Sequence, residues 1–276
     1  MKYTKMHGAG NSFVIVEDFH NELAGADLPR LAVHLCAQSD KKTDGMMVVC
    51  PAAPPANFGM LFYNNDGSVG EMCGNGARCI CRYGYEHGYA PNPEKICVQA
   101  TAGLVTGRRL TQELYEVRLN DPTVIDLHRK AEALGKEYDC AYIELGDPGL
   151  PHAVVLAEEA DFEDMDLLRE KGRALRRSAA FPKGANVTFV LPLGGKNVKA
   201  ITFERGVEDF TLACGTGCGA SSAALILRGV IPGNEVQLDM PGGHLSVTLT
   251  SDGSSARNLL LTGPTAVVGE FESDMI

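Results

Sequence analysis

The motif Cys-Gly-polar-Gly occurs twice in this chain, and each copy precedes a run of small or apolar residues. The first copy begins at Cys73 (Cys-Gly-Asn-Gly) and the second at Cys214 (Cys-Gly-Thr-Gly). The two cysteines lie 141 residues apart in a chain of 276 residues. A repeat at about half the chain length predicts a duplicated unit and two like domains.

The residues after each motif predict a helix. Both stretches are rich in Ala, Cys, Ser and Gly and poor in charge, so we expect each helix to be buried inside its half of the chain and surrounded by strands. Two further helices are predicted over residues 28–36, which carry an apolar stripe, and over the charged residues 165–177.

Short β-type runs outnumber these helices and favour a largely antiparallel α+β protein. The runs are 13–16, 46–50, 58–63, 96–100, 115–119, 153–156, 186–191, 200–203, 236–240, 245–249 and 259–261. We expect two pseudo-symmetric lobes, each a barrel-like sheet around a central helix, with the two motifs facing each other across a cleft.

Turn residues at Asn120, Asp121 and Pro122 follow a predicted strand and mark the expected boundary between the lobes. The N-terminal lobe is predicted over 1–120, with 264–276 returning to it, and the C-terminal lobe over 121–263.

Charge and hydropathy exclude several classes of partner. The chain has 25 Lys and Arg against 35 Asp and Glu, a net charge of −10, and no basic run longer than two residues. Binding nucleic acid needs a basic face, so we expect no nucleic-acid partner. No apolar run approaches the roughly 18 residues that span a bilayer, and the N-terminus lacks an apolar leader. We therefore expect a cytoplasmic protein with no membrane contact.

A Gly-x-Gly segment at a helix N-terminus presents backbone N–H groups and about half a positive charge. Such a site suits a carboxylate. The same field lowers the pKa of a thiol placed there, because it favours the thiolate. We therefore predict that Cys73 and Cys214 are reactive.

Two such helix ends facing each other would hold one carboxylate with a sulfur on either side of the adjacent carbon. One thiolate would remove the α-proton from one face while the opposite thiol delivers a proton to the other, and the helix dipoles would stabilise the enolate-like charge. This two-base inversion requires no cofactor.

Other interpretations of the cysteines were weighed. The chain has nine, an odd number, and in a reducing compartment we interpret the remaining seven as packing residues. The spacings do not match a zinc ribbon, so no metal is expected. The Cys-x-x-Cys of a redox motif and the Gly-x4-Gly-Lys-Ser/Thr of a phosphate loop are absent. An inactivating disulfide between Cys73 and Cys214 remains a hypothesis.

With these motifs in view, the chain resembles the diaminopimelate epimerase family of cofactor-independent racemases. The resemblance rests on three motifs in order over nearly the whole length. They are Lys-Met-His-Gly-Ala-Gly-Asn-Ser-Phe at 5–13, Asn-Asn-Asp-Gly-Ser at 64–68 leading to Glu-Met-Cys-Gly-Asn-Gly-Ala-Arg-Cys at 71–79, and Glu-Arg-Gly-Val at 204–207 leading to Ala-Cys-Gly-Thr-Gly at 213–217.

The resemblance implies roles for individual residues. Cys73 and Cys214 would be the acid/base pair. The reacting carboxylate would be held by the backbone amides of Gly74, Asn75, Gly215 and Thr216. The far carboxylate would be bound by Asn11, Asn64, Asn186 and Arg205. Glu204 would lie near the amino groups of the substrate, and His152 would lie near the active site. It also implies an amino-acid substrate and a homodimer.

Structural alternatives exist for several of these residues. Asn64 can shape a turn, since Asp66 and Gly67 follow it. Glu204 and Arg205 can form a surface ion pair, Asn186 can be merely structural, and His152 can be a hydrogen-bonded structural histidine.

Three departures from the family pattern concern substrate recognition. Ser12 replaces a usual Asp, Leu150 stands where a substrate-contacting Asn is common before Pro-His, and Phe210 stands where an acidic residue is common. They bear on the identity of the amino acid more than on the reaction.

The sequence favours epimerisation of LL-diaminopimelate to the meso form, a step toward lysine and peptidoglycan precursors. A related two-cysteine racemase of histidine or glutamate is the alternative within the enzyme class, and a non-enzymatic thiol- or metal-binding protein is the alternative from another class.

Overall fold

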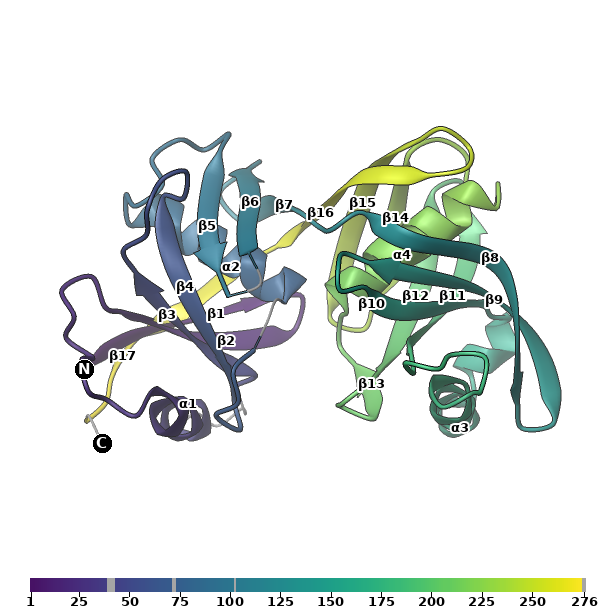
Figure 1. The fold of residues 1–276 in the computed structure, drawn as a ribbon, viewed down its shortest axis with the longest axis horizontal. Coiled ribbons are helices and arrows are strands. Elements are labelled where there is room, and N and C mark those ends of the chain that lie inside the picture. The colour runs from purple at the N-terminus through teal and green to yellow at the C-terminus, as the bar shows by residue number, and fades with distance from the viewer. Residues whose placement is uncertain (39–42, 71–72, 102, 275–276) are drawn as a thin grey trace. The chain divides into compact units, whose positions relative to one another are not determined.

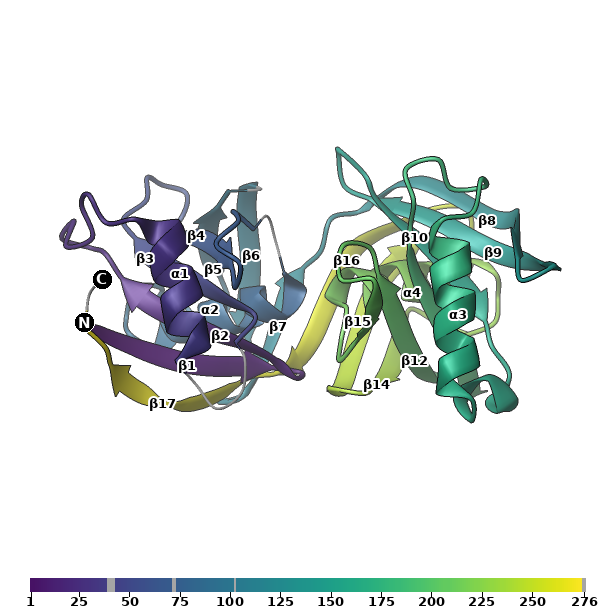
Figure 2. The same ribbon diagram turned by 90° about the horizontal axis from the view of Figure 1, so that it is seen from below.

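The computed structural model describes residues 1–38, 43–70, 73–101 and 103–274. The chain divides into two compact units (Figures 1 and 2). Unit 1 comprises Met1–Val117 and Thr262–Ile276, and unit 2 comprises Arg118–Leu261. Unit 1 therefore contains both the start and the end of the chain.

Unit 1 is a sheet with two helices. Its strands form a continuous series of neighbours in which β17, β1 and β2 are antiparallel, β2 and β3 parallel, β3 and β4 antiparallel, β4 and β5 parallel, and β5, β6 and β7 antiparallel. Its elements are β1 (Lys2–Gly8), β2 (Asn11–Glu17), α1 (Leu28–Ala37), β3 (Gly45–Cys50), β4 (Phe58–Asn64), α2 (Gly74–Glu86), β5 (Ile96–Ala100), β6 (Gly103–Arg109), β7 (Leu114–Arg118) and β17 (Ala266–Glu272).

Unit 2 has the same plan. Antiparallel strands β8, β9 and β10 are followed by the parallel pair β10–β11, the antiparallel pair β11–β12, the parallel pair β12–β14 and the antiparallel pair β14–β15. Its elements are β8 (Pro122–Ala133), β9 (Lys136–Leu145), β10 (Leu150–Leu156), the 3₁₀ helix η1 (Glu159–Phe162), α3 (Met165–Arg176), β11 (Asn186–Gly194), β12 (Asn197–Glu204), β13 (Asp209–Thr211), α4 (Gly215–Leu227), β14 (Glu235–Met240), β15 (Gly243–Ser251) and β16 (Ala256–Pro264).

The two units repeat one order of elements. In each, a helix connects two parallel strands twice: α1 and α2 in unit 1, α3 and α4 in unit 2. Parallel neighbours need a long crossover, which a helix supplies. The predicted α+β class with predominantly antiparallel pairing is confirmed, and so are the four predicted helices.

Helices α2 and α4 lie inside their sheets (Figure 1). Helix α2 contacts strands β1, β2, β5 and β6, and α4 contacts β8, β9, β10, β11, β14 and β15. Small residues permit this close packing. A Cβ added at Gly84 would lie 2.2 Å from the Phe58 ring, and one at Gly76 would lie 2.4 Å from the Met47 methyl carbon. The small-residue composition that predicted buried helices is therefore a requirement of the packing.

Several strands lie outside the runs that the sequence predicted. These are β1, β6, β8, β9, β13 and β17. The apolar signal is weak in β8 and β17, since most residues of β8 and all of β17 are at least partly exposed. Pairing with a neighbouring strand, rather than burial of a face, makes these two segments extended. Strand β9 differs, because its second half, 140–145, is buried.

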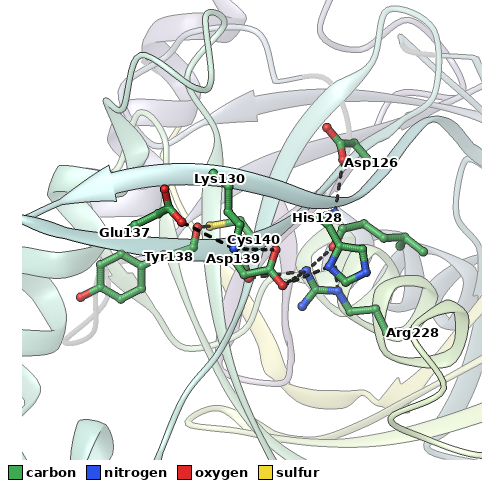
Figure 3. Close-up of polar contacts among 9 residues, drawn as sticks. Asp126, His128, Lys130, Glu137, Tyr138, Asp139, Cys140 and Arg228 are labelled. Carbon is green, nitrogen blue, oxygen red and sulfur yellow. Dashed lines mark hydrogen bonds and ion pairs between the residues drawn. The ribbon is translucent and has the colours of Figure 1, made fainter.

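The β8–β9 hairpin is attached to the end of α4 (Figure 3). Arg228, the C-cap residue of α4, donates hydrogen bonds from Nε and an Nη atom to the Leu127 carbonyl and lies 3.6 Å from the Asp139 carboxylate. His128 contacts the same carboxylate at 3.0 Å. The guanidinium is nearly buried, so these polar partners compensate for its lost hydration.

Candidate active site

The first half of the candidate site lies at the N-terminus of α2 in unit 1. Cys73 is the N-cap residue, with extended backbone angles (φ −121°, ψ 119°), and its carbonyl accepts the Ala77 N–H at 2.7 Å. Its side chain is partly exposed. An α-helix does not use its first amides internally, so Gly74 and Asn75 present donors beside this thiol.

Asn11 reaches the same helix end from β2. The Asn75 amide donates to Asn11 Oδ1 at 2.5 Å, and Asn75 Oδ1 accepts from the buried Arg78 guanidinium at 2.7 Å. A Cβ at Gly8 would lie 3.1 Å from the Asn75 carbonyl oxygen. The close approach of the β1–β2 turn to α2 therefore brings Asn11, Gly74 and Asn75 together.

Asn64 has contacts within its own turn. Its Nδ2 donates to Ser68 Oγ at 2.9 Å, and its carbonyl accepts the Gly67 N–H at 2.9 Å. These contacts agree with the turn-shaping alternative. Its substrate-binding role stays a prediction. Residues 71 and 72 of the second motif lie outside the described residues.

The second half of the candidate site lies at the N-terminus of α4 in unit 2. Cys214 is the N-cap residue, its Sγ accepts the Gly217 N–H at 3.4 Å, and Thr216 Oγ1 lies 3.5 Å from the same sulfur. Two buried hydroxyls, of Thr188 and Thr202, lie 3.0 Å apart, and a Cβ at Gly217 would meet both. Glycine is thus required in the first turn of α4.

The predicted lowering of the Cys214 pKa is wrong for this structure. Burial raises the pKa of the Cys214 thiol well above its ordinary value, and the negative charge of Glu204 raises it further. Hydrogen bonds from Thr216 and the Gly217 amide act in the opposite direction but are outweighed. The thiol is therefore protonated at neutral pH, because loss of hydration dominates over the helix terminus.

Three other predicted residues of unit 2 lie near one another: Asn186 begins β11, Glu204 ends β12, and Arg205 follows it in a turn. Asn186, at the start of β11, accepts the Arg205 backbone N–H at 2.8 Å through Oδ1. The Arg205 guanidinium donates to the Lys183 carbonyl at 2.9 Å. Glu204 accepts a hydrogen bond from Thr211 Oγ1 at 2.5 Å. Asn186 and Arg205 are therefore joined directly, and Glu204 is the residue that affects Cys214 electrostatically.

His152 pairs with Asn186 in the parallel ladder between β10 and β11. It is fully buried, and neither ring nitrogen has a hydrogen-bond partner among the described residues. Both roles considered for His152, near the site and structural, stay predictions. Burial, assisted by the Arg205 charge, lowers the pKa of His152 to about 3, so its imidazole is neutral at physiological pH.

The structure gives an account of the three departures. The Ser12 backbone N–H donates to the Asp44 carboxylate at 2.8 Å, so a carboxylate is present beside this position. Leu150 pairs with Leu145 across β9 and β10. Phe210 packs edge-on against Phe203, with ring centroids 5.8 Å apart. Leu150 therefore takes part in strand pairing, and Phe210 takes part in aromatic packing.

Sequence reasoning missed Asp44, Lys183 and Thr211, which contact predicted site residues. Thr211 was detectable from its position before the Ala-Cys-Gly-Thr-Gly segment, but Asp44 and Lys183 reach their partners only through the fold.

A separate cavity of about 480 Å³ in unit 1 is lined by residues of β1, β2 and α2, and by none of the predicted site residues. Its Glu17 carboxylate already accepts hydrogen bonds from Tyr83 at 2.8 Å and Tyr89 at 2.6 Å. The helix N-termini are the better candidates for a reactive site.

In the described part of the chain, no group of three or more His, Cys, Asp and Glu side chains is arranged to hold a metal ion. None of the nine cysteines is joined in a disulfide. No helix within the described residues has the length and apolar character needed to cross a membrane.

The fold places the chain in one structural class with isomerases and phenazine-biosynthesis proteins. A Bacillus anthracis protein of the PhzF family superposes with a TM-score of 0.74 over 99% of both chains at 14% identity. A probable proline racemase from Agrobacterium radiobacter superposes with a TM-score of 0.67, over 100% of this chain and 93% of that one, at 16% identity. At these identities the likeness concerns the fold.

Sequence comparison identifies the family. A family model described as diaminopimelate epimerase matches residues 3–117 and 146–268. The diaminopimelate epimerase of Hydrogenobaculum sp. (strain Y04AAS1) is 33% identical, with 98% of this chain and 97% of that protein covered, and that of Aquifex aeolicus is 34% identical, with 95% and 94% covered. The chain belongs to the diaminopimelate epimerase family.

The effect of Glu204 on Cys214 is testable. Glu204→Gln removes the charge that raises the pKa of Cys214, so at pH 8 the thiolate fraction and the rate of labelling by iodoacetamide should rise, by about three- to tenfold. Peptide mass spectrometry measures the labelling of Cys214. Glu235→Gln, which removes a carboxylate paired with Lys196, is the control; equal rates in both variants would contradict the electrostatic role.

Proposed function

We propose that this protein is an isomerase that epimerises LL-diaminopimelate to meso-diaminopimelate at Cα without a cofactor, with Cys73 and Cys214 as the acid/base pair. The observation that carries the proposal is that each cysteine is the N-cap of a central helix. Membership of the family supports the substrate. The product belongs to lysine and peptidoglycan precursor biosynthesis.

The helix ends suit a carboxylate that gains charge during the reaction. Amides of Gly74 and Asn75 at one helix and of Gly215 and Thr216 at the other are the proposed donors to the reacting carboxylate. As the α-proton leaves, negative charge develops on that carboxylate, and oriented amides stabilise it more in the transition state than in the ground state.

The raised pKa of Cys214 supports an acid role for this thiol in one direction of the reaction. Its pKa is raised by burial and by Glu204, so it enters as the thiol that delivers a proton. The partly exposed Cys73 is then proposed as the base that removes the α-proton. After one turnover Cys73 carries the proton taken from Cα and Cys214 has given its proton to the opposite face, so the two sulfurs have exchanged protonation states and the reverse reaction uses them in the opposite roles.

Recognition of the far end of the substrate is assigned to Asn11, Asn64, Asn186 and Arg205. Arg presents a planar fork that matches a carboxylate, and Asn side chains add neutral donors. Glu204 is assigned to the substrate ammonium groups. A substrate without a second carboxylate would leave such donors partly unpaired, which disfavours it.

The substrate is tested by α-proton exchange in heavy water. We expect fast incorporation of deuterium at Cα of diaminopimelate and slow incorporation for histidine, glutamate and other L-amino acids. Mass spectrometry measures the incorporation. A preference for histidine or glutamate would replace the proposed substrate with that of another two-cysteine racemase. Absence of exchange with every amino acid would reject the proposed epimerase activity.

The two-base mechanism is tested by removing each sulfur. Cys73→Ala and Cys214→Ala should each lower the rate of epimerisation by about 10²-fold or more, because each removes a proton donor or acceptor. Cys36→Ala is the control, since Cys36 is buried against the core of unit 1, and its rate should be unchanged. Full activity of either of the first two variants would reject the mechanism.

We further propose a cytoplasmic homodimer, from the family resemblance and from the odd number of cysteines, nine, which cannot all be paired with one another in the chain. Sedimentation velocity should give twice the 29.5 kDa chain mass, and cell fractionation should place the protein with the cytoplasm. A particle with the mass of one chain would reject the homodimer, and recovery of the protein outside the cytoplasm would reject the cytoplasmic location.

A further inference from the structure

The direction of the Arg205 side chain depends on one backbone carbonyl. Arg205 is exposed, and its guanidinium donates to the Lys183 carbonyl at 2.9 Å. Lys183 lies in a turn closed by the Gly184 N–H and the Phe181 carbonyl at 2.7 Å. Whatever holds this turn, residues 181–184, also determines where the guanidinium points.

The turn is held by strand β9. The ring of Phe181 stacks on that of Tyr142, with centroids 5.5 Å apart and planes inclined by 7°. The Lys183 ammonium donates to Glu144 Oε2 at 2.8 Å. Tyr142 and Glu144 are two residues apart, so they lie on one face of β9.

Strand β8 strengthens the same attachment. The Arg129 guanidinium lies over the Tyr142 ring, 4.0 Å from its centroid, and donates to the Ala180 carbonyl at 3.5 Å. Arg129, Tyr142 and Glu144 together are called the turn anchor.

Glu144 is the charged centre of the turn anchor. It is 6% exposed, and its second oxygen accepts the Tyr142 hydroxyl at 2.6 Å. A Cβ at Gly149 would lie 2.4 Å from Glu144 Oε2, so the neighbouring loop needs glycine to leave room for the carboxylate. Although burial alone would raise the pKa of Glu144, the Lys183 and Tyr142 hydrogen bonds hold it below its ordinary value. The ionised carboxylate is therefore a stable partner for Lys183.

We propose that Glu144 is a positioning residue: through Lys183 it fixes the turn whose carbonyl orients Arg205 toward the far carboxylate of the substrate. The inference rests on the proposed function. The family match stops at residue 117 and resumes at residue 146, so the whole turn anchor lies between the matched segments and is inferred from the contacts of this chain.

The test separates recognition of the far carboxylate from general stability. Glu144→Gln keeps the shape of the side chain and removes its charge. We expect KM for diaminopimelate to rise about three- to tenfold with kcat changed less than about twofold, since binding at a remote group is lost equally in the ground and transition states. Deuterium exchange into L-lysine, which lacks the far carboxylate, should keep its wild-type rate.

Glu137→Gln is the matched control, because Glu137 lies on β9 but pairs with the exposed Lys130 at 3.6 Å. It should leave both substrates unaffected. An unchanged KM in Glu144→Gln, or an equal loss for diaminopimelate and lysine, would overturn the inference.

Lys183→Met removes the same ion pair from its exposed side and should reproduce the rise in KM. If circular dichroism shows that Glu144→Gln does not fold, the KM and lysine-exchange measurements are made on Lys183→Met instead, with the same outcomes for or against the inference. A wild-type protein that fails to exchange diaminopimelate would instead reject the proposed function.

Discussion

Each unit of this protein depends on burying a whole helix inside a sheet. A helix surrounded by strands has to be narrow, and glycines such as Gly76 and Gly84 in α2 leave room for Met47 and Phe58. The helix must also end somewhere, and its first amides have no partners within the helix. Closing the protein around a helix therefore produces a polar, amide-rich end. In both units the residue at this end is a cysteine.

Burial controls the charges around the second helix end more strongly than the helix dipole does. The dipole and amide contacts favour a thiolate at Cys214, yet lost hydration and the nearby Glu204 keep it protonated. The same lost hydration keeps His152 neutral although its ring nitrogens have no partner in the described structure. A site that moves a proton benefits from this balance, because a thiol held protonated is ready to donate.

The sequence predicted the parts of the fold that local pattern determines. The glycine-flanked cysteines, the small-residue helices and the apolar strands carry their signal within a few residues, and all were recognisable. Strands β8 and β17 were not, because their partly exposed residues show little alternation. Contacts such as Lys183 with Arg205 join distant segments, and only the fold brings them together. The pKa of Cys214 could not be predicted because it depends on burial and on Glu204, which lies ten residues earlier in the chain.

The β8–β9 hairpin connects these observations. Near its middle it is attached to the C-terminus of α4, the helix that begins at Cys214, through Arg228 (Figure 3). Toward the end of β9 it holds the turn that orients Arg205, through Tyr142 and Glu144. One hairpin thus supports both α4, the helix that begins at the proposed catalytic Cys214, and the Arg205 guanidinium, which is proposed to bind the far carboxylate of the substrate. Tyr142 and Cys140 of this hairpin pack in the core of unit 2, whereas the Glu144 contact is an ion pair with the exposed Lys183. A substitution that removes only this charge contact can therefore change recognition while the buried helix and its cysteine remain in place.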